Sequence, residues 1–282
     1  MQNKENRKWI ILFFLAVGVL LLIEASIYMR YGNKGKEPFR IAFVVDSEAS
    51  DAYENMKSGA ANAAMDSNCI IDFVDSSKEK QVEADEKIIV ENDKVTYSKG
   101  ELKVDNESMV SELGDRILKE TGCPKILLVS SGNQEKYAEI IDIFSSFFEE
   151  AGCESEYRPL STDEKKLRQS MYNLEQSGLF DCFIALDGPS IEAACEAKDR
   201  INRRIYVYGV DNSSESVYHL DSGGLEALAY RDEYSMGYIA VRQLLKDKDI
   251  NKEAEERNFY YIADRKTMYS ADLEKVLFPF VK

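Results

Sequence analysis

Apolar residues recur along this chain in two alternating patterns. Short apolar runs have the length of buried strands, and each is followed by a stretch whose apolar residues fall on one face of a helix. The runs 40–45 and 70–74, for example, flank a helical stretch in which Met56, Ala60 and Ala63 share one face. Strands that alternate with helices predict an α/β architecture with parallel strands and right-handed crossovers.

The alternation continues almost to the end of the chain. The strands expected from it are 40–45, 70–74, 125–129, 155–158, 182–186, 204–210, 226–229 and 259–263. The helices expected from it are 51–68, 108–121, 134–150, 163–176, 190–198 and 234–245, with a last helical turn at 271–276.

Residues 76–104 break this rhythm. A charged run is followed by three short apolar segments, 87–90, 95–97 and 102–104, and an Asn-Asp pair separates the first two. Such a pair favours a tight turn, so this stretch predicts a hairpin or meander and not another strand–helix–strand unit.

One long apolar segment sets the beginning of the chain apart. Residues 9–29 would form a helix about 31 Å long, near the thickness of a bilayer's hydrocarbon core. A cleaved signal peptide is the alternative, but Glu24-Ala25-Ser26 is a poor cleavage site and the apolar run resumes after it. We therefore expect a cytoplasmic tail at 1–8, a transmembrane signal anchor at 9–29 and a linker at 30–38. The protein would be a single-pass cell-membrane protein with an extracytoplasmic soluble body.

The chain is strongly acidic. Its 51 Asp and Glu residues outnumber 36 Lys and Arg residues, which gives a formal net charge of −15. Such a surface repels phosphate backbones, so no nucleic-acid partner is expected. The charge mainly keeps the body soluble.

Patterns that carry catalysis or bind metals are scarce. The only histidine, His219, is expected at the surface beside a turn. Five widely spaced cysteines without a CxxC pair argue against a disulfide framework or a zinc site. Cys69, Cys153 and Cys182 begin expected strands, where a small buried side chain fits. We expect no enzymatic activity, no metal and no cofactor.

Four segments carry a likeness to a known family. They are 41–46 (IAFVVD), 59–64 (GAANAA), 208–213 (YGVDNS) and 231–238 (RDEYSMGY), the last similar to the pattern Q-x-P-x-x-M-G-Y. In this order and spacing they resemble the type-1 periplasmic binding proteins of the ribose and galactose kind. They also resemble the ligand-binding domain of lactose-repressor-like regulators.

The resemblance runs from about residue 39 to 279 and implies two α/β lobes joined by crossing segments. A small polar ligand, often a sugar, would bind between the lobes, and hinge closure would follow. The first lobe would comprise about 39–121 plus a C-terminal part from about 235, and the second lobe about 124–234. The first lobe would be abbreviated, because 76–104 is too short for the two strand–helix units that the family has there.

Polar residues at the ends of the expected strands are the candidate ligand contacts, because parallel sheets bind ligands outside the carboxyl ends of their strands. The resemblance implies that Asp211 and Arg231 stand where the family has an acid and an amide that bind ligand hydroxyls. Tyr53 would cover the apolar side of a sugar ring. Asp and Ser at these places also serve as ordinary helix caps. The candidate set is Asp46, Ser47, Tyr53, Ser131, Asp187, Asp211 and Arg231.

The sequence departs from the family in ways that bear on the ligand. The arginine that grips the ligand in the family is absent from the matching stretch 140–144, and Arg231 adds a cation where the family has an amide. This cation favours a ligand with an acidic group.

Three classes of function follow from these expectations. The first is a membrane-anchored extracytoplasmic protein that binds a small polar, sugar-like ligand for an ABC transporter permease or a sensor histidine kinase in the same membrane. The second is an extracellular adaptor that contacts such a sensor or transporter without a ligand. An enzyme or a cytoplasmic regulator is the third, and the sequence favours it least.

Overall fold

The protein is described here by a computed structural model that places residues 38–45, 53–91, 94–132, 134–245 and 257–278. The expected tail, transmembrane segment and nearly all of the linker lie outside these residues. Among the described helices, none is both long and apolar enough to cross a bilayer.

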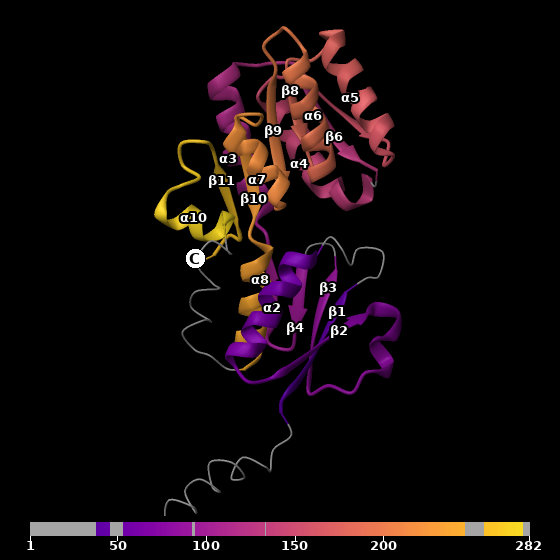
Figure 1. Ribbon diagram of the computed structural model, residues 1–282, viewed down its shortest axis with the longest axis vertical. Helices are drawn as coiled ribbons and strands as arrows, with labels where there is room; N and C mark the ends of the chain where they lie inside the picture. Colours follow the sequence, from indigo (N-terminus) through magenta and orange to yellow (C-terminus); the bar gives the residue numbers. More distant parts are fainter. Residues whose placement is uncertain (1–37, 46–52, 92–93, 133, 246–256, 279–282) are drawn as a thin grey trace, which may run out of the picture.

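Two α/β lobes lie one above the other along the long axis of the molecule, as predicted (Figure 1). Lobe 1 has a five-stranded sheet in the order β2-β1-β3-β4-β5, and lobe 2 has a six-stranded sheet in the order β11-β10-β9-β8-β6-β7. The lobe 1 strands are β1 (Arg40–Val45), β2 (Ile70–Asp75), β3 (Glu86–Glu91), β4 (Lys94–Tyr97) and β5 (Gly100–Lys103). The lobe 2 strands are β6 (Ile126–Ser131), β7 (Ser155–Leu160), β8 (Cys182–Ala185), β9 (Tyr206–Asp211), β10 (Ala227–Arg231) and β11 (Tyr260–Ala263).

Described α-helices cover both faces of the lobe 2 sheet, whereas in lobe 1 they cover one face of the sheet. They are α2 (Glu54–Asp66), α3 (Asn106–Thr121), α4 (Gln134–Glu150), α5 (Glu164–Ser177), α6 (Gly188–Arg200), α7 (Ser214–Ser222), α8 (Glu233–Leu244) and α10 (Ala271–Leu277). In lobe 1, α2 and α8 pack on the face that carries Ile41 and Phe43. The opposite face carries Ala42 and Val44, and the 3-10 helix η2 (Ser76–Gln81) with the residues after it packs there.

The contact between α2 and α8 requires glycine on both helices. A Cβ atom on Gly59 would lie 2.0 Å from the carbonyl oxygen of Tyr234, and one on Gly237 would lie 2.0 Å from that of Met56. The two backbones therefore touch, which explains why the sequence has glycine inside both helices despite its low helix propensity.

The predicted meander is confirmed. β3 pairs with β1 in parallel, and β4 and β5 then follow as antiparallel neighbours. Among its described residues, lobe 1 therefore has two parallel pairings, β1 with β2 and β1 with β3. The abbreviated first lobe that the sequence indicated is what the chain forms.

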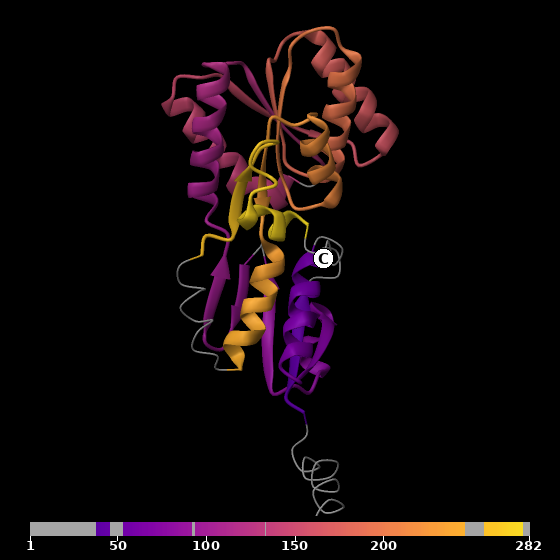
Figure 2. The same ribbon diagram turned by 60° about the vertical axis from the view of Figure 1, so that its left-hand side comes forward.

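The chain crosses between the lobes at three places that lie together. The crossings follow β5, follow β10 and precede β11 (Figures 1 and 2). Their backbones are hydrogen-bonded, since Asp105 N donates to Asn258 O at 3.2 Å and Asp232 N donates to Phe259 O at 2.9 Å. These bonds make one narrow waist.

Several elements lie elsewhere than the sequence indicated. α3 packs on α4 in lobe 2, where it was expected in lobe 1, because its apolar face extends the core over the second sheet. β11 pairs antiparallel with β10, and α10 packs in the same lobe, so α8 is the one described element of the C-terminal part that belongs to lobe 1. The helix α7 was not predicted, and half-buried His219 lies in it.

One expectation about the cysteines was wrong. Cys123 and Cys153 form a disulfide with their Cα atoms 5.4 Å apart, whereas Cys153 was expected as a free buried side chain. No local pattern predicts this pairing, because the two residues are 30 positions apart and meet only when α4 returns the chain beside β6. Of the other cysteines, Cys182 and Cys195 are buried and Cys69 is half-buried.

Glu175 is a fully buried carboxyl group in lobe 2. The side chain of Glu175 on α5 has no exposed surface, and neither of its oxygens has a hydrogen-bond partner among the described residues. Burial raises the pKa of Glu175 to about 8, although Arg203 and Lys198 oppose this shift. The folded protein therefore holds a proton here at neutral pH that the unfolded chain releases.

This group makes stability depend on pH. Because the folded pKa lies above the unfolded value of 4.5, the free energy of unfolding should fall as pH rises from about 4.5 to about 8. Glu175→Gln should be near neutral at pH 5 and more stable than wild type by roughly a few kcal/mol at pH 9. Urea denaturation at both pH values measures this, with Glu150→Gln on the exposed face of α4 as control. Equal effects of Glu175→Gln at both pH values would contradict it.

Candidate functional site

The candidate site is a cavity of about 440 Å³ at the carboxyl ends of the lobe 2 strands. In the sheet order, β7 and β8 lie on opposite sides of β6, so the direction in which successive strands are added reverses between β6 and β8. Open parallel sheets bind ligands at such a switch point. Four of the seven residues proposed from the sequence line this cavity, namely Ser131, Asp187, Asp211 and Arg231.

Asp187 ties the two sides of the switch point together. Its Oδ2 atom accepts a hydrogen bond from Ser131 N at the end of β6, at 2.7 Å. Its Oδ1 atom accepts one from Ser190 N at 2.8 Å and so caps α6. The buried carboxylate thus shapes the wall of the cavity by fixing the loop after β6.

Asp211 ends β9 and is held on one side only. Its Oδ2 atom accepts hydrogen bonds from Ser213 N at 3.1 Å, from Ser213 Oγ and from Ser216 Oγ, both at 2.5 Å. Within the described chain no residue donates to Oδ1. A carboxylate oriented in this way keeps acceptor positions for a ligand hydroxyl. Gly188 permits the arrangement, because a Cβ atom there would come within 3.3 Å of Asp211 Oδ2.

Arg231 lies where the cavity meets a second one. It is the last residue of β10, is only 5% exposed, and lines both the 440 Å³ cavity and a neighbouring cavity of about 230 Å³. The second cavity is bounded from lobe 1 by Lys94, Glu101 and Lys103 of the meander. Lys94 is paired with Glu101, at 2.5 Å. The meander therefore supplies charged side chains next to Arg231.

Lobe 1 reaches the site through the start of α2. Asn55 donates a hydrogen bond from Nδ2 to the carbonyl oxygen of Asn212, at 3.0 Å, and so connects the lobes directly across the cavity edge. Tyr53 precedes α2, is only 5% exposed and packs in the core, so it does not line the cavity. Asp46 and Ser47 lie outside the described residues.

The structure adds wall residues that the strand-end argument missed. Lys136 and Tyr137 come from the first turn of α4, and Glu233 comes from the first turn of α8. The first turn after a strand end faces the same edge of the sheet, so helix-start positions were the signal that could have identified them. The remaining additions are Leu186, Gly188, Pro189, Val210, Asn212 and Ser213.

The walls of the main cavity carry both signs of charge. Asp187, Asp211 and Glu233 line it together with Lys136 and Arg231. The pKa of the neighbouring Tyr230 phenol is raised, first by burial and then by the negative charges of Asp232, Glu233 and Asp211. Among the described residues no group of three or more His, Cys, Asp or Glu side chains could hold a metal ion. This surface can hydrogen-bond a polyhydroxylated ligand through acceptors and donors together.

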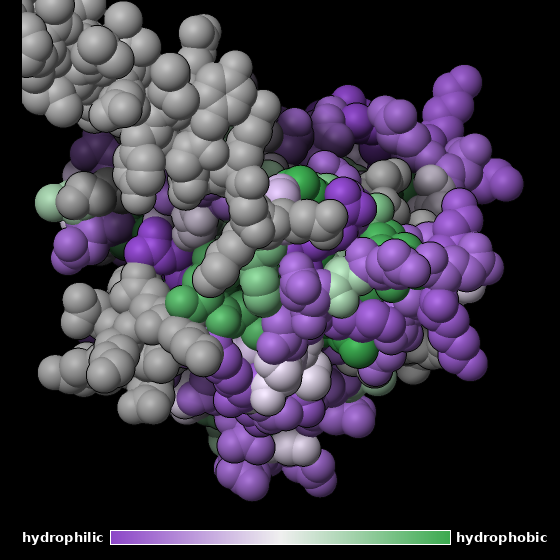
Figure 3. All heavy atoms as spheres, turned by 90° about the horizontal axis from the view of Figure 1, so that it is seen from below, coloured by the Kyte–Doolittle hydropathy of each residue, from purple (hydrophilic) through white to green (hydrophobic). Residues whose placement is uncertain are grey.

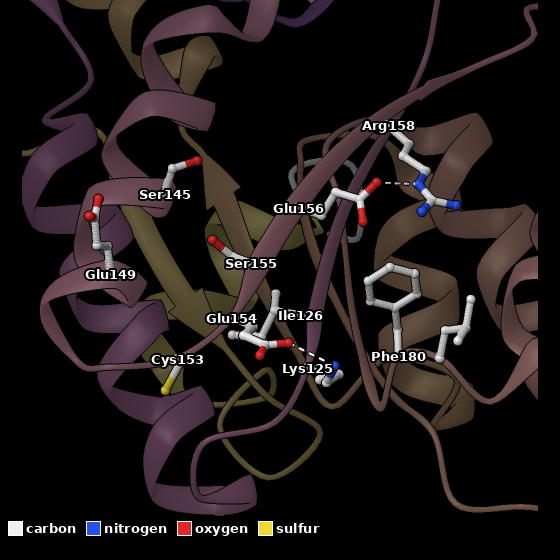
Figure 4. A pocket seen from close by; sticks show the side chains of 11 residues that line it. Lys125, Ile126, Ser145, Glu149, Cys153, Glu154, Ser155, Glu156, Arg158 and Phe180 are labelled. Atoms are coloured by element: carbon white, nitrogen blue, oxygen red, sulfur yellow. Dashed lines mark hydrogen bonds and ion pairs between the residues drawn. The ribbon is translucent and has the colours of Figure 1, made fainter.

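A larger hollow of about 710 Å³ lies at the opposite end of lobe 2, beside β7 (Figure 4). It contains none of the seven residues proposed from the sequence, and it lies away from both the switch point and the waist. The 440 Å³ cavity at the switch point is therefore the better candidate for ligand binding, although it is smaller than this hollow.

Comparison with known proteins identifies the fold. No family model and no curated protein sequence matches the chain. Solved structures do. The chain has the fold of the type-1 periplasmic sugar-binding proteins. Identities of 14–15% establish this fold and nothing finer.

Three of these structures show the extent of the likeness. A glucose-galactose binding protein from Geobacillus stearothermophilus superposes with a TM-score of 0.65 at 14% identity, covering 83% of this chain and 100% of that one. A carbohydrate transporter solute-binding protein from Agrobacterium radiobacter, in complex with D-arabinose, gives 0.66 at 15%, covering 86% and 100%. A carbohydrate transporter from Acidothermus cellulolyticus, in complex with myo-inositol, gives 0.65 at 15%, covering 86% and 99%. All three are named as binding or transport proteins.

The tie made by Asp187 can be tested through stability. Asp187→Ala leaves two backbone N–H groups without their acceptor and should lower the free energy of unfolding by about 1–3 kcal/mol. Asp187→Asn keeps one acceptor oxygen and should cost less. Chemical denaturation of both variants measures the difference, and an alanine variant as stable as wild type would show that the tie is unimportant.

Proposed function

We propose that this protein is a membrane-anchored extracytoplasmic solute-binding protein whose ligand is a small polyhydroxylated molecule. The observation that carries this proposal is the gathering of Ser131, Asp187, Asp211 and Arg231 around one cavity at the switch point of lobe 2. Strand-end residues far apart in sequence converge there, beside a waist that can act as a hinge.

The waist supports a binding role because it concentrates the connections between the lobes. The three crossings are held side by side by backbone bonds at Asp105 and Asp232. Rotation about such a short line closes or opens the cleft with few other changes. A ligand that contacts both lobes then stabilises the closed form through its differential affinity.

A sugar-like ligand is supported by the chemistry of the walls. Asp211, Asn212 and Ser213 offer acceptors and donors, and Tyr137 offers an aromatic side chain. The solved structures with this fold include complexes with D-fucose, D-arabinose and myo-inositol, which are all polyhydroxylated.

The location outside the cytoplasm rests on two observations. The Cys123–Cys153 disulfide is typical of oxidising compartments, and the apolar segment 9–29 has the length of a transmembrane helix. The described chain enters lobe 1 at the end opposite to the cleft, where β1 begins. Figure 3 views this end and shows hydrophobic side chains near its middle, with hydrophilic ones around them. We propose that this end lies within the linker's reach of the membrane and that a permease or sensor histidine kinase there is the partner.

A ligand-independent adaptor is the second candidate. It is favoured by the hydrogen bonds that the acids of the cavity already accept within the protein. Both oxygens of Asp187 and one oxygen of Asp211 are used in this way. The Asn55–Asn212 bond also holds the lobes together without a ligand.

Ligand binding separates the two candidates. We expect the full-length protein in detergent to show a raised melting temperature with at least one compound from a screen containing D-fucose, D-arabinose, myo-inositol and hexuronic acids. Asp211→Ala should weaken that binding roughly 10- to 100-fold by calorimetry, since a hydrogen bond to a buried hydroxyl contributes about 1–3 kcal/mol. Glu215→Gln, on the exposed surface of α7, is the matched control. A broad screen without any shift would favour the adaptor.

A further inference from the structure

The strand β7 forms a free edge of the lobe 2 sheet. Within the described part of the chain it pairs only with β6, with Ile126 opposite Ser155 and Ser131 opposite Leu160. An exposed edge strand presents a row of backbone donors and acceptors to any further strand. The question is therefore which strand fits beside it.

The backbone N–H and carbonyl groups of β7 point alternately toward β6 and toward the free edge. The carbonyl oxygens of Glu154 and Leu160 accept hydrogen bonds from Ile126 N and Gly132 N, so even-numbered residues turn their backbone groups toward β6. Alternation then turns those of Ser155, Tyr157 and Pro159 outward. Proline lacks a donor and is tolerated at this outward position. The free edge thus offers two N–H groups and three carbonyl oxygens.

The 710 Å³ hollow lies along this edge and is lined from both faces of the sheet. Ser145 and Glu149 of α4 stand on one side, and Arg158 and Phe180 stand on the other, with Ser155 and Glu156 between them (Figure 4). A hollow that flanks the edge of a sheet on both faces has the position that one more strand would occupy. Leu179, at 59% exposure, adds an apolar side chain to its wall.

The charges on β7 indicate which strand would pair with its free edge. Glu156 and Arg158 are two residues apart, point to the same face and bond to each other at 2.6 Å. An antiparallel copy centred on Tyr157 places Glu156 opposite Arg158 of the second copy, and Arg158 opposite its Glu156. Cross-strand pairs of opposite charge are favourable, whereas an edge with one sign of charge repels its own copy.

We propose that β7 is the interface of a twofold dimer of this chain, in which two β7 strands pair antiparallel about Tyr157. The two lobe 2 sheets then become one continuous sheet, as an isologous interface requires. In this register Tyr157 exchanges two backbone hydrogen bonds with its copy. Ser155 N donates to the carbonyl oxygen of Pro159 in each direction, so proline's missing donor falls at the end of the interface.

The edge is held rigid before pairing. The Cys123–Cys153 disulfide lies two residues before β7 begins, and Lys125 pairs with Glu154 at 2.7 Å. Further along β7, the Arg158 guanidinium lies 5.3 Å from the centre of the Phe180 ring. These contacts reduce the conformational entropy that pairing would cost.

The proposed anchor restricts how such a dimer sits. Antiparallel β7 strands direct the two lobe 1 ends away from each other, so both copies share one membrane only when their long axes lie along it. The linker 30–38 spans about 30 Å when extended, which permits this arrangement. The dimer itself does not depend on the proposed ligand.

Charge reversal tests the pairing on the full-length protein in detergent, by light scattering and by co-purification of two differently tagged copies. Glu156→Lys leaves two cations on each β7, and Arg158→Glu leaves two acids. Each variant alone should raise the dimer dissociation constant roughly 10-fold or more. A mixture of the two variants should restore association, and so should the double exchange Glu156→Arg with Arg158→Glu.

The restoration distinguishes pairing from a loss of folding, because a misfolded variant is not rescued by a partner of opposite charge. Circular dichroism and melting temperature check that each single variant stays folded. A wild-type protein that remains monomeric at high micromolar concentration would overturn the proposal. So would a dimer whose dissociation constant is the same in wild type, Glu156→Lys and Arg158→Glu, because its interface would lie elsewhere.

Discussion

The carboxylate of Asp187 is the interaction on which the candidate site depends. Sheet order alone brings β6 and β8 side by side, but their following loops diverge, one toward α4 and the other into α6. One buried carboxylate accepts a hydrogen bond from each loop and so fixes both at the point of divergence. The cavity exists because these loops separate, and it keeps a defined shape because Asp187 ties them at its base.

The second constraint is the shortened first lobe. A meander replaces the strand–helix units that a larger lobe would place over its sheet, so β4 and β5 expose a polar outer face with Thr96, Glu101 and Lys103. The meander also brings Lys94 and Lys103 to the cavity beside Arg231. Charged residues of the meander therefore form part of the wall beside Arg231.

The two ends of the lobe 2 strands carry different surfaces. Their carboxyl ends enclose a cavity with mixed polar groups, while the beginning of the edge strand β7 carries an open groove with paired charges. A rigid sheet between them lets both surfaces exist without mutual interference.

Much of this organisation follows from the sequence. The periodicity of apolar residues determined the α/β class, the meander at 76–104 and the strand ends, because buried strands and amphipathic helices leave direct patterns. For the same reason Ser131, Asp187, Asp211 and Arg231 could be named as neighbours before any contact was known: parallel strands end at one edge of a sheet. Those predictions use only local spacing and one topological rule.

Only the tertiary structure decided the rest. It placed α3 and β11 in lobe 2, because an amphipathic face does not specify which of two sheets it covers. It paired Cys123 with Cys153 across 30 residues, removed Tyr53 from the cleft wall by burying it in the core, and added Tyr137 and Glu233 through helix starts. It also showed that β7 is an edge with an open groove. Each of these depends on contacts between residues far apart in sequence, which no local pattern records.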